Sequence, residues 1–121
     1  MKSHETPTPL TPAVFYILFS LANREKHGYE IMKQVKQDTH GRVNMGPGTL
    51  YGSIKRMLAD VLIEEAGDRV DPQSGDERRR YYRLTDRGRA ALNTELQRYT
   101  EVVTTAEKRG LIPLQPGELN L

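Results

Sequence analysis

The sequence predicts a mainly α-helical fold with one small β-hairpin and a long C-terminal helix. Apolar residues first recur at helical spacing in three successive segments that end near residue 61. Two short segments of alternating polarity follow, separated by turn-forming residues, and beyond them the apolar residues are spaced 4, 3, 4, 3. The 121 residues suffice for one domain and an appendage, and a hydrophobic content of 36% indicates that a second copy completes part of the apolar surface.

The composition excludes several classes of protein. With no cysteine, the chain has neither disulfides nor thiolate metal ligands. The apolar run at 10–22 is too short to span a bilayer and residues 1–9 lack the pattern of a signal peptide, so we expect a cytoplasmic protein without a membrane partner. The formal net charge of +2 does not by itself indicate nucleic acid, but residues 23–60 carry seven Lys or Arg against four Asp or Glu. The basic excess lies around the third predicted helix.

The first predicted helix begins at Thr11-Pro12, an N-cap followed by proline at the first helical position, and runs to about residue 22. The polar residues 1–9 before it are expected to form a flexible arm. Phe15 and Phe19 extend the apolar surface beyond the stripe that faces the core, so most of the helix must be covered. We expect a second subunit to cover the added surface; a helix at the centre of a monomeric core is the alternative.

A second helix is expected over about 27–39, after a polar turn at 23–26, and a third helix within 46–61. In the third helix one apolar stripe can be buried; its members are Leu50, Ile54, Met57, Leu58 and Val61. Pro47 and two glycines precede the stripe, and Thr49 is expected to cap the helix. Two helices, a turn and a third helix form the order of a helix-turn-helix unit placed on a first helix.

The outer face of the third helix is small and basic. Gly52 and Ser53 lack the bulk to hold a close-approaching surface away, and Lys55 and Arg56 can reach a phosphate or the edge of a guanine. The free N–H groups of the first turn, around Thr49, attract anions. These features predict a DNA recognition helix. An amphipathic surface helix with solvated cations is the alternative.

Residues 63–70 and 77–84 predict a two-stranded hairpin with a long tip, and a hairpin directly after a recognition helix is a wing. Its outgoing strand carries Arg78, Arg79 and Arg80, which we expect to contact backbone phosphates or to enter a minor groove. In the alternative, these arginines form a solvated ion-pair cluster with nearby acids. The acids in question are Asp71, Asp76 and Glu77.

The last helix is expected from Thr85-Asp86 to about residue 110, with the threonine as its N-cap. Its apolar residues form a seam typical of a helix that packs along another long helix; they are Leu92, Leu96, Tyr99, Val103 and Ala106. We expect this seam to form a dimer interface with its own copy and with Phe15 and Phe19 of the other subunit. Packing back on the same domain is the alternative. The predicted divisions are a flexible arm (1–9), a winged helix-turn-helix domain (10–84), a C-terminal dimerisation helix (85–110) and a tail (111–121).

Four motifs of the chain occur together. They are Leu10-Thr11-Pro12 with the apolar helix after it, His27-Gly28-Tyr29-Glu30-Ile31-Met32, Gly46-Pro47-Gly48-Thr49-Leu50-Tyr51-Gly52, and Arg79-Arg80-Tyr81-Tyr82-Arg83-Leu84-Thr85-Asp86-Arg87-Gly88. This set resembles the PadR-like transcriptional regulators over roughly residues 10–92. The third and fourth motifs are specific in combination, because winged helices of other families do not usually carry both. With a single C-terminal helix, the chain is similar to the smaller subgroup of the family.

The resemblance implies a dimeric winged-helix repressor that binds a pseudo-palindromic operator in double-stranded DNA and is released by a small aromatic or hydrophobic effector. By position it implies DNA contacts for Tyr29, Thr49, Tyr51, Lys55 and Arg56, with the wing arginines on the backbone. For Tyr51, packing against the second helix is the alternative.

The sequence therefore predicts a sequence-specific DNA-binding transcriptional regulator that acts as a homodimer. A winged-helix module that binds protein without specific DNA binding is the alternative, but it would need an apolar or acidic outer face where Lys55 and Arg56 stand. No enzyme is expected, because no nucleophile is placed to pair with His4, His27 or His40. No metal-ligand cluster or phosphate-binding glycine loop occurs in the sequence, so we expect no catalytic residue, cofactor or metal.

Overall fold

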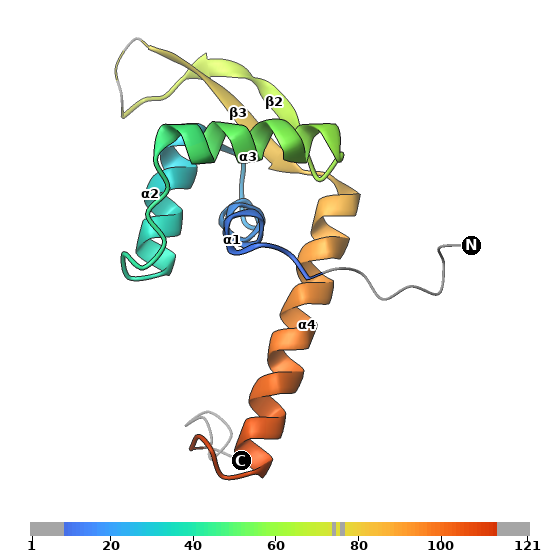
Figure 1. The fold of residues 1–121 in the computed structure, drawn as a ribbon. Helices are drawn as coiled ribbons and strands as arrows, with labels where there is room; N and C mark the ends of the chain where they lie inside the picture. Colours follow the sequence, from blue (N-terminus) through green and yellow to red (C-terminus); the bar gives the residue numbers. More distant parts are fainter. Residues whose placement is uncertain (1–8, 74, 76, 114–121) are drawn as a thin grey trace, which may run out of the picture.

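The computed structural model describes residues 9–73, 75 and 77–113, so residues 1–8 of the predicted arm and 114–121 of the predicted tail lie outside the described residues. The elements follow in the order α1 (Pro12–Ser20), β1 (Lys26–His27), α2 (Gly28–Asp38), α3 (Pro47–Ala59), β2 (Ile63–Val70), β3 (Arg78–Leu84) and α4 (Asp86–Lys108). Figure 1 shows α1 in the middle of the molecule, α3 across one end beside the β2–β3 hairpin, and α4 leading away from that end. The predicted fold, mainly α-helical with a small hairpin in a winged helix-turn-helix, is confirmed.

α1 lies at the centre of the hydrophobic core. Thr11 Oγ1 caps its N-terminus as predicted. Ile17 and Leu18 are fully buried and Phe15 is nearly so, because α2, α3 and α4 all pack against α1. The chain's own helices thus cover most of α1, as in the alternative of a helix central to its own core. Phe19 keeps an exposed side.

The sheet contains three antiparallel strands in the order β1–β3–β2. The sequence predicts only a polar turn at 23–26, and this is wrong for Lys26, which pairs with Tyr82 of β3 while His27 pairs with Tyr81. A two-residue strand is too short to show a periodicity of its own, so its pairing depends on β3.

The buried side chain of Lys26 explains why a charged residue stands at this point of the fold. Its ammonium group donates hydrogen bonds to the backbone oxygen of Ser20 (2.5 Å) and to Asn23 Oδ1 (2.9 Å). Burial lowers the pKa of Lys26. The lysine therefore closes the C-terminal end of α1, where carbonyl groups lack helical partners and a cation is favourable.

α3 begins earlier than the sequence predicts. Its N-cap is Gly46 and its first helical residue is Pro47, so the prediction of Thr49 as N-cap is wrong. Proline at the first helical position already has the helical φ and needs no N–H partner, which leaves Thr49 inside the first turn. The part of the predicted stripe that is buried consists of Leu50, Ile54 and Met57.

The turn at 60–62 joins α3 to β2 and is held by the first turn of α4. Val61, predicted in the buried stripe, is instead exposed there, with φ at 58°, an unfavourable backbone region for a β-branched residue. Thr85 Oγ1 donates to the Val61 carbonyl oxygen (2.6 Å) and accepts from the Gly88 amide (3.0 Å). Arg87 Nε donates to the carbonyl oxygen just before Val61 (3.0 Å). These contacts fix the end of α3 to the beginning of α4.

α4 is 23 residues long, and only its first half packs on the rest of the chain. Leu92 and Glu95 are buried, whereas residues 99–105 are all exposed. The second half extends away from the body, as Figure 1 shows. Within the described ranges, no helix combines the length and apolar content needed to cross a membrane.

Candidate nucleic-acid interface

The predicted recognition helix, the wing and the beginning of α2 meet at one end of the molecule. In Figure 1, α3 crosses this end, β2 and β3 lie beside it, and α4 runs to the opposite end. A winged helix that binds DNA inserts one helix into the major groove and needs that helix on an unobstructed face. α3 meets this requirement.

The cations of α3 are available to a partner. Lys55 and Arg56 are both exposed, and neither side chain forms an ion pair or hydrogen bond with any described residue. Thr49, in the first turn, is also exposed, and no side chain caps the helix there. The outer surface of α3 is therefore basic, as predicted.

Ser53 does not belong to this surface. The residue is 1% exposed, so a DNA contact from its hydroxyl is contradicted. It follows Leu50 by three positions and precedes Met57 by four, which places it on the buried side of the helix. Its Oγ has no hydrogen-bond partner among the described residues. The helical spacing alone was sufficient to predict this burial.

Within the part of the chain that the structure describes, no packing contact requires glycine at position 52. A Cβ built at this position would meet no atom within 4 Å. Glycine in a helix interior costs roughly 1 kcal/mol relative to alanine, because the unfolded backbone is freer and no side chain covers the helix. The fold therefore pays a stability cost at Gly52 without gaining a contact inside the subunit.

Tyr51 rests on the beginning of α2. A Cβ on Gly28 would overlap the ring and hydroxyl of Tyr51, so only glycine leaves room for the ring there. The alternative of packing against the second helix is thus correct for one side of the ring. The residue remains 49% exposed, so its other side is open to a partner.

The wing arginines differ in their surroundings. Arg80 Nε donates to Asp68 Oδ1 (3.2 Å), and its Nη1 lies 3.5 Å from Glu65. Arg78 donates to the backbone oxygen of Asp68 (3.0 Å). The ion-pair alternative therefore describes Arg80, whose partners are acids of β2, and also Arg79, which pairs with Glu77, one of the acids named for it. Of the other named acids, Asp76 lies outside the described residues.

Arg79 points to the other face of β3. It pairs with Glu77 (3.3 Å), whose side chain is 67% exposed, and its guanidinium carbon lies 6.0 Å from the centre of the Tyr29 ring. Lys33, one helical turn after Tyr29, lies 5.2 Å from the same ring centre. The sequence did not single out Lys33, because only the fold brings α2 beside the wing.

A network of ion pairs also joins Glu25, the residue before β1, to the base of the wing. Glu25 accepts hydrogen bonds from Arg69 and from Arg83 (3.4 Å), and Arg83 also donates to Glu64 (2.7 Å). The bond from Arg69 is the main cause that lowers the pKa of Glu25. These arginines are engaged within the sheet.

His27 connects α2 with the wing. Its Nδ1 accepts a hydrogen bond from the Glu30 amide (3.3 Å) as the N-cap of α2, so its Nε2 carries the proton that Asp71 accepts (2.7 Å). The Tyr81 ring contacts the imidazole edge-on, with ring centres 5.3 Å apart. Bonds from the Gln73 amide and from His27 lower the pKa of Asp71. The sequence signal for this role is the His-x-x-Glu capping box at the start of α2.

Several residues predicted at the dimer interface are buried within their own subunit. Leu92 is 2% exposed and Phe15 5% exposed, so neither side chain is available to a partner, which corrects the prediction for both. Leu96 is half-buried against the same core. The first half of α4 therefore packs on its own domain, because its seam faces α1.

Among the described residues, no element covers the outer part of the seam. Tyr99 and Val103 are exposed, and Ala106 is half-buried. Val102, 67% exposed, adds apolar surface that the 4, 3, 4, 3 spacing omits. Near the middle of α4, the Tyr99 ring meets Phe15 edge-on (5.0 Å between centres) and its hydroxyl donates to the buried Glu95 (3.2 Å). Burial and the bond to Glu95 raise the pKa of Tyr99.

The fold defines a winged-helix protein, and the exposed basic surface of α3 is of the kind that such proteins present to a binding partner. Residues 17–94 match the family model described as the Transcriptional regulator PadR-like family. The chain belongs to this family, which is one of transcriptional regulators rather than of enzymes. A relative, Transcriptional regulator Rv3488 of Mycobacterium tuberculosis, is 34% identical over 87 residues, covering 72% of this chain and 75% of the relative.

Solved structures of the same family share the fold. A PadR family transcription regulator from Clostridium difficile R20291 is 28% identical and superposes with a TM-score of 0.67, covering 81% of this chain and 97% of that chain. Bacillus subtilis PadR, solved in complex with operator DNA, is 21% identical with a TM-score of 0.62, covering 74% of this chain and 48% of that chain. At this lower identity the likeness shows the fold alone.

Proposed function

We propose that two copies of this chain bind a pseudo-palindromic operator in duplex DNA, with α3 of each copy in the major groove. The observation that carries this proposal is the outer face of α3, where exposed Lys55 and Arg56, unpaired among the described residues, follow Gly52 by three and four positions, and a Cβ at Gly52 would meet none of the described atoms. The membership of a family of transcriptional regulators supports it. In a symmetric dimer the two recognition helices would enter successive major grooves, roughly 34 Å apart.

The glycine at position 52 supports close approach of DNA. Gly52 is partly buried, and the missing Cβ allows the helix backbone to come nearer to a partner than any other residue would. Lys55 lies three positions further on, within reach of the same surface. A protein partner with an acidic surface is the competing explanation for the two cations, but it does not explain why position 52 is a glycine.

The second half of α4 supports dimer formation. Tyr99, Val102 and Val103 expose apolar surface along a helix that no other described element covers. A second copy of α4 offers the same surface, and a two-fold interface needs such a self-complementary patch. Two DNA-binding faces joined in this way match a two-fold operator.

We propose repression as the outcome, acting in the cytoplasm where the DNA lies, because a dimer on an operator near a promoter excludes other proteins from that segment. A small aromatic or hydrophobic effector fits best beside Phe19 and Tyr99, whose rings are partly exposed and both contact the ring of Phe15. A ligand there would change the packing of α4 against the partner copy, and α4 is joined directly to the end of α3.

Replacing Lys55 or Arg56 by alanine tests the recognition helix. If the side chain reads a base, each change should weaken operator binding by about 1–3 kcal/mol. If it contacts a phosphate, each change should reduce the slope of the logarithm of the binding constant against the logarithm of the salt concentration, here called the salt slope. The operator is first obtained as the genomic fragment that the purified protein retains at physiological salt, and binding is then followed by fluorescence anisotropy.

The control for both variants is Lys108→Ala, which removes the same charge at the far end of α4. This variant should bind as the wild type does. Unchanged affinity and unchanged salt slope for both α3 variants would exclude α3 as the recognition helix. Retention of an acidic protein, without preference among duplexes, would favour the protein-binding alternative.

Gly52→Ala should change stability and DNA binding in opposite directions. The added methyl meets nothing in the subunit, so the free energy of unfolding should rise by about 0.5–1 kcal/mol. The same methyl would hold the DNA away, and operator affinity should fall at least about tenfold, or 1.4 kcal/mol. Asn93→Ala, an exposed α4 position with a similar gain in helix propensity, should leave affinity unchanged. Undiminished binding by Gly52→Ala would show that DNA does not approach this position.

A further inference from the structure

We infer that Arg87, at the beginning of α4, is a positioning residue that selects the spacing between the two half-sites of the operator. It acts within a joint between α3 and α4, which consists of the turn at 60–62 together with Thr85, Arg87 and Gly88. The inference rests on the proposed dimer on a two-fold operator. It adds the part of the chain that sets the distance between the two recognition helices.

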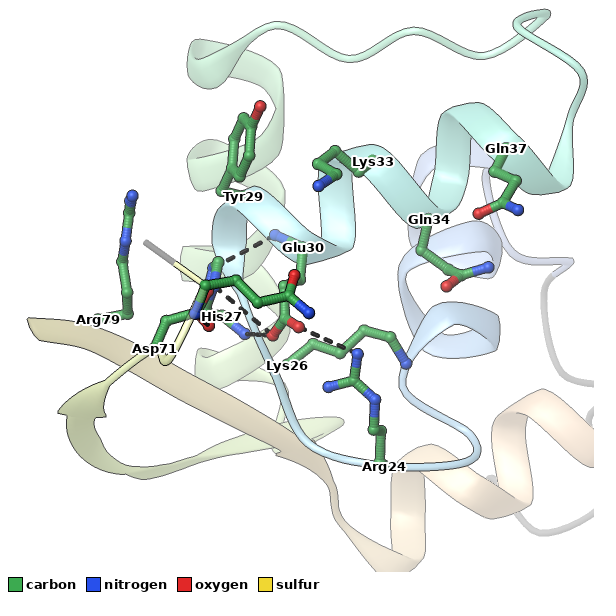
Figure 2. A pocket seen from close by; sticks show the side chains of 11 residues that line it. Arg24, Lys26, His27, Tyr29, Glu30, Lys33, Gln34, Gln37, Asp71 and Arg79 are labelled. Atoms are coloured by element: carbon green, nitrogen blue, oxygen red, sulfur yellow. Dashed lines mark hydrogen bonds and ion pairs between the residues drawn. The ribbon is translucent and has the colours of Figure 1, made fainter. Parts of the chain in front are cut away.

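The DNA-binding elements of one subunit are tied to one another. Tyr51 of α3 packs on Gly28 at the start of α2. Figure 2 shows His27 beside Asp71, and the hydrogen bond between them (2.7 Å) joins the same end of α2 to the wing. α2, α3 and the wing therefore form one unit. The position of this unit relative to α4, which carries the proposed dimer surface, decides where each α3 lies in the dimer.

Apolar packing alone leaves freedom between this unit and α4. The first half of α4 packs on α1 and the core through Leu92 and Leu96. Such contacts have no preferred direction, and packed helices slide by about 1–2 Å in proteins that change conformation. A slide of about 1.7 Å in each of two copies adds up to the rise of one base pair, about 3.4 Å. Directional contacts are therefore needed to hold the two α3 helices at one spacing.

The joint contains such directional contacts. Arg87 Nε donates a hydrogen bond to the carbonyl oxygen of Asp60, the C-cap of α3 (3.0 Å). Thr85 Oγ1 donates to the carbonyl oxygen of Val61 (2.6 Å), and the Thr85 amide donates to that of Leu62 (3.2 Å). The beginning of α4 thus binds three successive carbonyl groups after α3. These bonds fix the end of α3 in both position and rotation relative to α4.

The backbone of the turn is strained and depends on these bonds. Val61 has φ at 58°, a region that is unfavourable for a β-branched residue, and its side chain is 57% exposed and so gains little from packing. A conformation of this kind persists only where surrounding contacts determine it, and such residues cluster at functional sites. The contacts with α4 therefore hold the turn in a geometry that its own sequence does not favour.

Arg87 is the member of the joint that can be changed without disrupting the fold. Its side chain is exposed, whereas Gly88 has no room for a Cβ and Thr85 caps α4. A glutamine at position 87 has its amide nitrogen on Cδ, where arginine has Nε, so Arg87→Gln keeps the donor and removes the charge. Arg87→Met keeps an unbranched side chain but has no donor.

The spacing of the half-sites tests the joint. The retained operator is compared with versions in which one base pair is inserted or removed between the half-sites, a shift of about 3.4 Å and about a tenth of a turn. The wild type should bind the altered operators at least about tenfold more weakly, because both half-sites are no longer bound together. Arg87→Met should reduce this ratio to about threefold or less, since a looser joint lets both subunits bind. Arg87→Gln should keep the wild-type ratio in fluorescence anisotropy.

Arg89→Met is the matched control. Arg89 is exposed on the same turn of α4, but its Nη2 lies 3.5 Å from the carbonyl oxygen of Ala22, after α1, rather than from the end of α3. This variant should keep the wild-type ratio, and an equal loss of selectivity would overturn the assignment to the α3 joint. A purely structural role of Arg87 would lower Tm in Arg87→Met and leave the ratio unchanged, which would also overturn the inference.

The same measurements separate the joint from a direct DNA contact. If Arg87 bound a phosphate, Arg87→Gln and Arg87→Met would both reduce the salt slope and weaken binding equally at every spacing, and the inference would be wrong. If the wild type bound all three spacings equally, the inference would fail while DNA binding stood. If the wild type retained no duplex DNA, the proposed function itself would fail.

Discussion

Gly88→Ala is expected to unfold the protein at temperatures where the wild type is stable. A Cβ on Gly88 would overlap the carbonyl oxygen of Leu62, a backbone atom that no side-chain rotation can move. To make room, α4 must move away from the turn at 60–62 and break the Thr85–Val61 hydrogen bond. The expected loss is about 3 kcal/mol or more, a large fraction of the stability of a small domain. Thermal unfolding at fixed protein concentration should show a fall in Tm of more than about 10 °C.

Gly48→Ala is the matched control for Gly88→Ala. Gly48 lies in the first turn of α3, as Gly88 lies in the first turn of α4, but a Cβ on Gly48 meets nothing within 4 Å. Its replacement should leave Tm unchanged or raise it slightly. A wild-type Tm for Gly88→Ala would mean that the contact between α4 and the turn is looser than its geometry indicates.

The sequence predicts the helices and the hairpin well because their signals are local. Thr11 and Thr85 are caps that can be recognised from their own neighbours, and both cap as predicted. β1 has no such signal, since Lys26 joins the sheet only when β3 is beside it. Val61 was misassigned because helical spacing continues through it, whereas the backbone turns into the left-handed region at that residue.

The sequence predicts the residues of the candidate site only where their exposure depends on the periodicity of a single helix. The positions of Lys55 and Arg56 follow from the periodicity of α3, and the same periodicity, applied strictly, buries Ser53. The engagement of Arg80 by Asp68 depends on the register of β2 against β3, which no local pattern contains. Arg79 reaches the Tyr29 ring only through the packing of α2 on the wing, so sequence spacing gives no indication that Lys33 and Arg79 contact the same ring.

Val103→Glu is expected to convert the proposed dimer into monomers. Val103 lies in the outer half of α4, where its apolar surface is uncovered in the subunit and is proposed to pack on the partner. A carboxylate buried there lacks a partner cation and costs several kcal/mol, and the two-fold interface contains the change twice. The dimer dissociation constant should rise at least about a hundredfold, or 2.8 kcal/mol. Sedimentation velocity at micromolar concentration should then show the mass of one chain.

Loss of the dimer should also weaken operator binding by about 10²–10⁴-fold, because the second half-site no longer binds at a high effective concentration. Gln97→Glu is the control, since it adds the same charge at an exposed α4 position away from the seam. Leu96 is a poorer choice for the test, because it packs on its own core and a charge there would destabilise the subunit itself. If the Val103→Glu variant remained dimeric, the dimer interface would not lie on the outer half of α4. If the variant were monomeric but kept the wild-type affinity for the operator, the proposal that two linked subunits each bind one half-site would be contradicted.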